Sequence, residues 1–255
     1  MSWGSAWRLA VGTLTVLPVR PPDVVDRTVA GRAMALASLA VLPLAVAAAG
    51  LGWLAGRTGW PPLLSGLVVV AVLVLGTRAL HLDGLADTVD GLGSGRERER
   101  ALEIMRRGDV GPMGVVALVL VLGGQSAAAS VLVADAGGAA LLVVLIAASR
   151  AALLIGCRSG VPAARPGGLG SAVAGSVRNS VLIEIWAVTA VVVVAIGVLV
   201  GVAWWCGLGA VLLGAGVAYG IVRLAIRRLG GITGDLLGAT VELTLLSMLL
   251  TATVV

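Results

Sequence analysis

Three carboxylates, Asp83, Asp87 and Asp90, lie within eight residues in the segment HLDGLADTVDGLG. On a helix, positions i, i+4 and i+7 point within about 60° of one another, so the three acids would share one face over roughly 10 Å. Adjacent carboxylates repel one another unless they are protonated or bridged by cations. Oxygen ligands at this spacing suit Mg²⁺, with Mn²⁺ as an alternative, bound together with substrate phosphates. A solvated acidic helix end is the weaker interpretation, because the residues between the acids are mainly apolar.

A second pair of acids, Asp235 and Glu242, lies in the segment LGGITGDLLGATVELTLL near the C-terminus. Seven residues apart on a helix, they share a face, and Glu242 lies roughly 10 Å deeper along the helix axis. An ionisable side chain inside an apolar span is costly, so it indicates a functional site and needs a partner. The partner we expect is the first group of acids, bridged by metal. The predicted metal ligands are therefore Asp83, Asp87, Asp90, Asp235 and Glu242.

Arginines are expected around such a site, because phosphate oxygens held at a metal also need cationic hydrogen-bond donors. Arg150 stands out because it lies within an apolar run, and Arg165 because it lies in the glycine-rich segment 160–176. Arg106 and Arg107 are further candidates for binding substrate. For any single loop arginine, the simpler interpretation is that it sets membrane topology.

Small residues begin the second acidic segment, with Gly231, Thr233 and Gly234 as candidates for substrate binding. Two explanations fit them, the approach of backbone to a phosphate at a helix start or close helix packing. His81 is the single histidine and lies two residues before the first acid. On a helix it points away from the acidic face. We expect it to support the substrate site rather than to act directly in catalysis.

The elements that carry these residues are expected to be transmembrane helices. Of the 255 residues, 59% are hydrophobic and only 12% are charged, and the mean hydropathy is +1.07. A soluble domain has roughly 25% charged residues, so this composition indicates an integral membrane protein. No polar block is large enough to fold separately, so residues 1–255 are predicted to form one all-α catalytic domain, a polytopic membrane helix bundle. Seven windows approach the roughly 20 apolar residues that a span needs: 33–56, 62–80, 113–133, 138–157, 181–201, 206–226 and 236–255.

The arginines gather in the longer connections between these windows, at 81–112, 158–180 and 227–235. Alternating the connections across a bilayer places these three on one side with the N-terminus, and the positive-inside rule makes that side cytoplasmic. We therefore expect a multi-pass protein of the plasma membrane (cell inner membrane) with a cytoplasmic N-terminus and active site. Residues 1–18 are expected to form an interfacial or half-inserted helix. The net charge of +5 is spread between apolar runs, which does not favour nucleic-acid binding, and a homo-oligomer is compatible with the sequence.

The two acidic segments, together with RERALEIMRRGDVGPMGVVALVL, closely resemble the cobalamin synthase (adenosylcobinamide-GDP ribazoletransferase) family. The resemblance covers nearly the whole chain, including SRAALL and the loop ARPGGLG. It implies an Mg²⁺-dependent membrane enzyme of late cobalamin assembly that joins adenosylcobinamide-GDP to α-ribazole, or to its 5′-phosphate, and releases GMP. The metal would neutralise the substrate pyrophosphate while the ribazole 3′-hydroxyl attacks. Either Asp90 or Glu242 would take the proton of that hydroxyl.

Two other classes of function stay open from the residues alone. Other aspartate-rich membrane transferases, such as CDP-alcohol phosphotransferases and prenyltransferases, also bind Mg²⁺ and diphosphate through paired acidic motifs, with different usual spacings. A cation-coupled transporter would use intramembrane acids as ion sites. Transporters, however, place such acids near the midplane on broken helices, whereas these acids follow an apolar run at the expected cytoplasmic edge.

Overall fold

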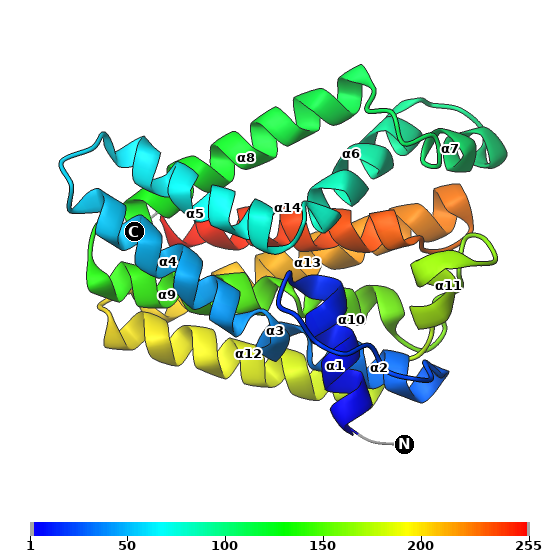
Figure 1. The fold of residues 1–255 in the computed structure, drawn as a ribbon, viewed down its shortest axis with the longest axis horizontal. Helices are drawn as coiled ribbons and strands as arrows, with labels where there is room; N and C mark the ends of the chain where they lie inside the picture. The colour runs from blue at the N-terminus through cyan, green and yellow to red at the C-terminus, as the bar shows by residue number, and fades with distance from the viewer. Residues whose placement is uncertain (1–2, 254–255) are drawn as a thin grey trace.

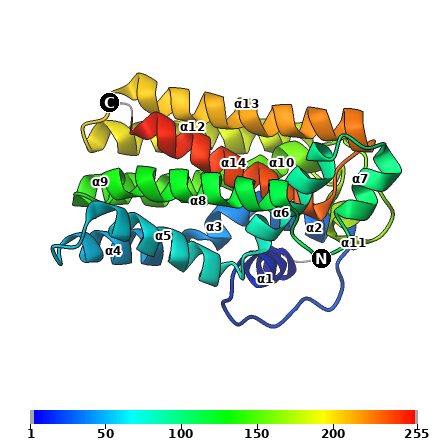
Figure 2. The same ribbon diagram turned by 90° about the horizontal axis from the view of Figure 1, so that it is seen from above.

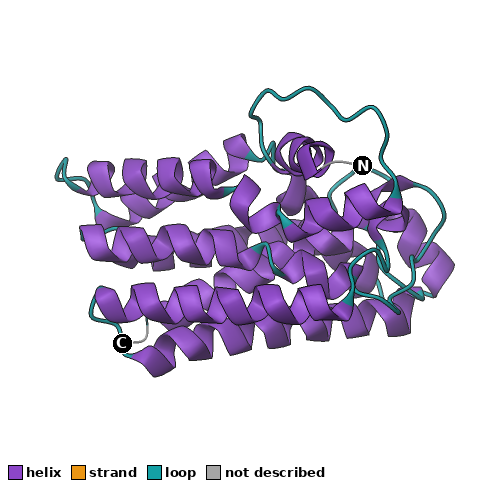
Figure 3. Ribbon diagram, turned by 90° about the horizontal axis from the view of Figure 1, so that it is seen from below, coloured by secondary structure: helices purple, strands orange, loops and turns teal. Residues whose placement is uncertain are grey.

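Helices make up the whole architecture of residues 3–253, which are the residues that the computed structural model describes, and no strand occurs among them (Figure 3). The all-α prediction is therefore confirmed. The helices are α1 (Trp3–Leu14), α2 (Arg27–Ala35), α3 (Ala37–Ala40), α4 (Leu42–Gly56), α5 (Pro62–Gly76), α6 (Leu80–Gly93), α7 (Arg98–Ile104), α8 (Pro112–Leu132), α9 (Ala136–Ser149), α10 (Ala152–Cys157), α11 (Gly168–Val173), α12 (Asn179–Leu199), α13 (Trp204–Leu229) and α14 (Gly234–Ala252).

The long helices run side by side, with tight turns at one end of the bundle and the longer loops, α7 and α11 at the other (Figures 1 and 2). Helix α14 is central: it packs against α6, α8, α9, α10, α11 and α13. Helix α12 lies at the outside, and only 11% of its apolar window is buried. Such a large exposed apolar surface is expected to contact lipid. The membrane prediction is therefore supported by the fold as well as by composition.

Five helices are long and apolar enough to cross a membrane, and the bent pair of α5 and α6 makes a sixth if it is counted as one span. The prediction of about seven spans is not reproduced in the described residues. Its first window, 33–56, is divided at Leu36 and Val41 into α2, α3 and α4. Pro43 lies in the first turn of α4, where its missing N–H is tolerated, but the same residue cannot continue a longer helix through this point.

The acidic segment does not continue straight from the second apolar run (62–80), because the chain bends sharply between them. Helices α5 and α6 meet at an angle of 92°. Arg78 and Ala79 take the left-handed conformation, with φ of 54° and 55°, which non-glycine residues rarely adopt. Helix α1 and the residues after it hold this turn: Val16 N donates to Gly76 O at 2.8 Å, and Arg78 Nη2 donates to Gly12 O at 2.8 Å. The bend carries α6 across α14.

Two glycines set how closely α6 and α14 approach. A Cβ added at Gly84 would lie 2.5 Å from Asp235 O, and one added at Gly238 would lie 2.9 Å from His81 O. Small residues at helix contacts permit such close backbone packing in membrane proteins. Packing therefore explains Gly238, and it also places the acids of α6 next to the start of α14.

Substituting Gly84 with alanine tests this contact. We expect Gly84→Ala to lower the free energy of unfolding by about 1–3 kcal/mol, because the new methyl group meets backbone that cannot rotate away. Gly123→Ala is the matched control, since a Cβ at this helical glycine has no neighbour within 4 Å. Alanine favours helix over glycine, so the control should be neutral or stabilising. Thermal unfolding in detergent measures both, and equal melting temperatures would contradict the close packing.

Candidate functional site

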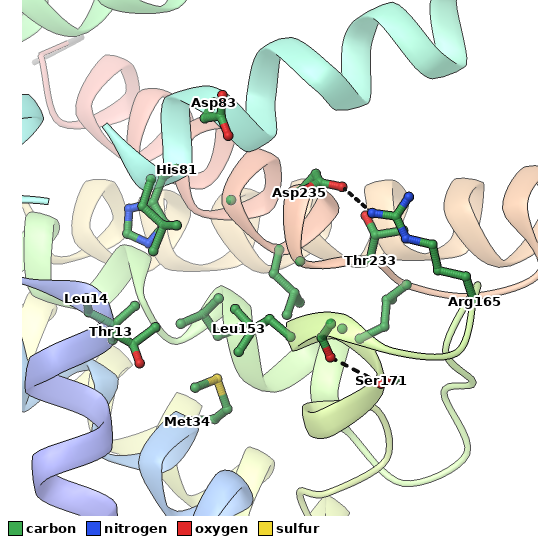
Figure 4. A pocket seen from close by; sticks show the side chains of 18 of the residues that line it. Thr13, Leu14, Met34, His81, Asp83, Leu153, Arg165, Ser171, Thr233 and Asp235 are labelled. Atoms are coloured by element: carbon green, nitrogen blue, oxygen red, sulfur yellow. Dashed lines mark hydrogen bonds and ion pairs between the residues drawn. The ribbon is translucent and has the colours of Figure 1, made fainter. Parts of the chain in front are cut away.

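A cavity of about 300 Å³ lies where α6, α14, α1 and the glycine-rich loop meet (Figure 4). Asp83 and His81 reach it from α6, Asp235 from the first turn of α14, and Arg165 from the loop. The walls are partly apolar and the charged groups gather at one side of the cavity, as Figure 4 shows. This combination of apolar walls and a few convergent charged groups is typical of a ligand site.

Asp83 and Asp235 line this cavity, and Asp87 lies four residues after Asp83 on α6 without lining it. Asp87 interacts electrostatically with Asp83, Asp235 and Asp90, and with Arg165. Asp83 is exposed, whereas Asp87 is 9% exposed. The two helices thus bring carboxylates from distant parts of the sequence into one negative region.

Arg165 is the cation beside this region. Its Nη2 lies 3.5 Å from Asp235 Oδ2, and its Nη1 donates to Leu102 O at 3.3 Å. The loop that carries it is held to the start of α14, because Ile232 N donates to Pro162 O and Ala164 N donates to Ile232 O, both at 2.9 Å. The backbone at Arg165 is therefore held in place while its guanidinium is partly exposed, which suits contact with an anionic ligand.

The start of α14 is built from the small residues that the sequence indicates. Thr233 caps the helix, and its Oγ1 accepts a hydrogen bond from Leu236 N at 3.1 Å. A Cβ at Gly231 would lie 2.4 Å from Pro162 O, so this glycine is explained by packing against the loop. Thr233 and Gly234 line the cavity and Gly231 does not.

The donor chemistry of Asp83, Asp87 and Asp235 fits a hard divalent cation, because all three supply carboxylate oxygens. Among residues 3–253, however, no three acidic, histidine or cysteine side chains are placed closely enough to hold an ion. Asp235 instead has Arg165 as its counter-charge. The metal site therefore stays a prediction, with Asp83, Asp87 and Asp235 as its candidate ligands.

Asp90 has backbone partners. Its Oδ2 accepts from Gly111 N at 2.7 Å and its Oδ1 from Gly114 N at 2.9 Å, so it caps the start of α8 from a neighbouring helix. A negative charge is stabilised at a helix N-terminus by the unpaired N–H groups and the helix dipole. Asp90 does not line the cavity, and its predicted roles as metal ligand and base stay predictions.

Glu242 lies in a separate buried polar cluster. Gln125 Nε2 donates to Glu242 Oε2 at 2.7 Å, and His81 Nδ1 lies 3.8 Å from Oε1. Arg150 and Glu242 line a small cavity of about 10 Å³, roughly the space of one water molecule. Glu242 does not line the cavity of Asp83 and Asp235, and its metal and base roles also stay predictions.

The remaining predicted residues divide between this cluster and the surface. Arg150 is 1% exposed, and its Nη1 donates to Ile146 O and Ser149 Oγ. Arg106 and Arg107 are exposed and do not line the cavity. Hydrogen bonds from Arg100 and Arg107 hold the pKa of the Glu103 carboxyl below its usual range, so Arg107 has a partner on α7.

Two residues of the site region were not found by sequence reasoning. Gln125 is the single glutamine of the chain and lies in an apolar run, which is a signal for a buried polar partner. Arg98 donates from Nη2 to Ala164 O at 2.9 Å and so ties α7 to the loop of Arg165. Nothing in the sequence distinguishes Arg98 from the other arginines of its segment.

Comparison with known proteins decides the family. The family model described as cobalamin-5-phosphate synthase matches residues 6–253. The chain belongs to the cobalamin-5-phosphate synthase family. The resemblance drawn from the two acidic segments is thereby confirmed, and both segments lie inside the matched range.

Curated relatives of this synthase family are similar along their whole length. The protein named adenosylcobinamide-GDP ribazoletransferase from Nocardioides sp. is 46% identical over 248 residues, which cover 96% of each chain. The protein of the same name from Frankia casuarinae is 41% identical and covers 95% of this chain and 92% of its own. A third, from Bradyrhizobium diazoefficiens, is 38% identical and covers 91% and 86%. No solved structure matches the chain.

Proposed function

We propose that this membrane protein is an adenosylcobinamide-GDP ribazoletransferase of cobalamin biosynthesis. It would join adenosylcobinamide-GDP to α-ribazole, or to its 5′-phosphate, and release GMP. The similarity of nearly the whole chain to relatives of that name supports this proposal. The structural observation that carries the chemistry is the meeting of Asp83, Asp235 and Arg165 at one cavity, with Asp87 interacting electrostatically with all three.

The proposed cofactor is Mg²⁺, with Mn²⁺ as the alternative, held by Asp83, Asp87 and Asp235. When bound, the ion would supply positive charge that stabilises the substrate pyrophosphate and the departing GMP. Asp90 and Glu242 are left out of this set because each already accepts hydrogen bonds elsewhere, Asp90 from the start of α8 and Glu242 from Gln125.

Arg165 is proposed to bind a phosphate oxygen of the substrate. Its guanidinium lies at the cavity wall within reach of Asp235, so an entering phosphate group would meet a cation already held in place. The apolar part of the wall, formed by residues such as Leu14, Met34 and Leu153, excludes water from that side and strengthens the electrostatic attraction.

The proposed location is the plasma membrane, with the active site on the cytoplasmic side. Arg165 and part of α11 line the cavity, and α11 lies at the bundle end that also carries α7 (Figure 1). Cytoplasmic loops of membrane proteins carry an excess of arginine and lysine. The lipid bilayer would surround the exposed faces of α8 and α12.

Metal removal tests the proposal. We expect the purified protein to form GMP from adenosylcobinamide-GDP and α-ribazole with Mg²⁺ present, to lose this activity with excess chelator, and to regain it when Mg²⁺ or Mn²⁺ is added back. Chromatography measures GMP and the joined product in the same samples. GMP formation that continues in chelator would overturn the metal assignment alone, whereas no product under any condition would overturn the transferase assignment.

A further inference from the structure

A second cavity, of about 490 Å³, lies between α1, α2 and the beginning of α12, away from the acids. Three arginines line it, Arg27, Arg32 and Arg178, and no acidic residue of the described chain does. Arginine side chains gathered without a carboxylate favour an anionic ligand, because each guanidinium offers several charged donors. The proposed reaction makes no use of this cavity.

The walls of this basic cavity are fixed by contacts of α2 with the loop that precedes α12. Arg27 Nη2 donates to Ala174 O at 3.1 Å and to Gly175 O at 3.0 Å. A Cβ at Gly31 would lie 2.4 Å from Ser176 O, so only glycine permits this approach. The hydroxyl of Ser176 is buried and has no hydrogen-bond partner among the described residues. Because this oxygen is enclosed, it is not a donor to the cavity, and the arginines supply the charged donors.

An apolar groove of about 430 Å³ continues from the basic cavity along the outer face of the bundle. Ala35 lines both, and α12 with its N-cap residue Arg178 forms one wall of both as far as Val192. Fourteen helical residues span about 21 Å, which exceeds the depth of about 15 Å of one hydrocarbon leaflet. Glu184 is the charged residue in the groove wall, and it lies on the part of α12 nearest the basic cavity. The deeper wall is formed by Leu42, Val144, Val188 and Val192.

We propose that the basic cavity and this groove together bind one anionic phospholipid. Its phosphate would lie between Arg32 and Arg178, and an acyl chain would follow α12 along the groove. The arginines favour an anionic headgroup. Because the cationic cavity continues into an apolar groove, an amphiphile fits the site better than a small anion. The Arg32 guanidinium lies 4.9 Å from the ring centre of Trp3, and tryptophan is enriched at membrane–water interfaces.

Native mass spectrometry of the delipidated full chain in nonionic detergent tests the proposal. Phosphatidylglycerol and phosphatidylcholine of the same acyl composition are added separately, and inorganic phosphate forms a third arm. We expect one tightly bound phosphatidylglycerol, with a Kd at least about tenfold below that of phosphatidylcholine, since each arginine near an anionic headgroup adds to affinity. Equal affinity for the two lipids would overturn the proposal.

Variants test whether the lipid preference depends on the arginines of the basic cavity or only on the net positive charge of the protein. Arg32→Gln with Arg178→Gln is expected to remove the preference for phosphatidylglycerol, and Arg178→Gln alone, at an exposed position, is expected to reduce it. The matched control, Arg20→Gln with Arg96→Gln, removes two exposed arginines outside the cavity and should keep the preference. Loss of the preference in the control as well as in the cavity variant would overturn the proposal.

A third variant separates a lipid from a small anion. Ala35→Leu fills the junction of cavity and groove while it keeps every arginine, so it should weaken phosphatidylglycerol binding. Unchanged lipid binding in Ala35→Leu would show that the acyl chain does not lie in the groove. Tight phosphate binding without lipid binding would assign the arginines to a free anion instead, and either result would overturn the proposal.

Discussion

Asp235→Asn is expected to lower kcat/KM for GMP release by about 100-fold or more while the protein stays folded. Asparagine keeps the size and shape of the side chain but removes the charge that the proposed metal and Arg165 both require. Loss of a metal's charge stabilisation amounts to several kcal/mol, and each 1.36 kcal/mol corresponds to a factor of ten. Asp83→Asn should have a similar effect, because Asp83 faces the same cavity from α6.

The control for this experiment is another aspartate-to-asparagine change at a helix start. Asp135 caps α9 by accepting from Gly138 N at 2.9 Å, and it does not line the cavity. Asparagine caps helices about as well as aspartate, so Asp135→Asn should leave both folding and turnover near the wild-type values. Steady-state GMP release at several Mg²⁺ concentrations gives kcat/KM and the metal dependence together. Near-normal turnover of both Asp83→Asn and Asp235→Asn would rule out the proposed metal site.

Local sequence patterns are sufficient to predict the family and several of the long apolar helices, but not the division of window 33–56 or the bend at residues 77–79. Apolar runs of sufficient length give the positions of α5, α8, α12, α13 and α14 because hydropathy is a property of consecutive residues. The bend depends on contacts that are distant in sequence, such as Val16 N with Gly76 O. Neither Arg78 nor Ala79 is a residue type that indicates a left-handed turn.

The bend also explains why the two acidic segments meet only in part. Gly84 packs against Asp235 and Gly238 against His81, so α6 and α14 run in opposite directions at their contact. In this register Asp83 and Asp87 lie beside the start of α14, whereas Glu242 lies toward the beginning of α6. Asp90 lies past the start of α14, about 20 Å from the level of Glu242 at 1.5 Å per residue. The spacing within each segment was sufficient to predict a shared face, but only the register between the helices determines which acids meet.

Breaking the buried polar cluster is expected to have the largest effect on stability. Arg150→Met should lower the free energy of unfolding by about 3–5 kcal/mol, because it leaves Glu242 buried without the cation that interacts with it. Glu242→Gln should also destabilise, since it leaves the charge of Arg150 without its counter-charge in the same small cavity. Gln125 still has an acceptor in this variant, so its hydrogen bond is not the cause.

The double variant separates an electrostatic pair from two independent packing defects. Arg150→Met with Glu242→Gln removes both charges, and buried ion pairs replaced by neutral groups of similar volume are often neutral in stability or better. We therefore expect the double variant to be more stable than Arg150→Met alone, with a coupling energy in the range of about 0.5–3 kcal/mol that residues coupled through a shared cavity show. Thermal or denaturant unfolding of the four proteins in one detergent measures this coupling. Additive losses would mean that Arg150 and Glu242 act separately, and would remove the electrostatic reason for an arginine in the middle of an apolar span.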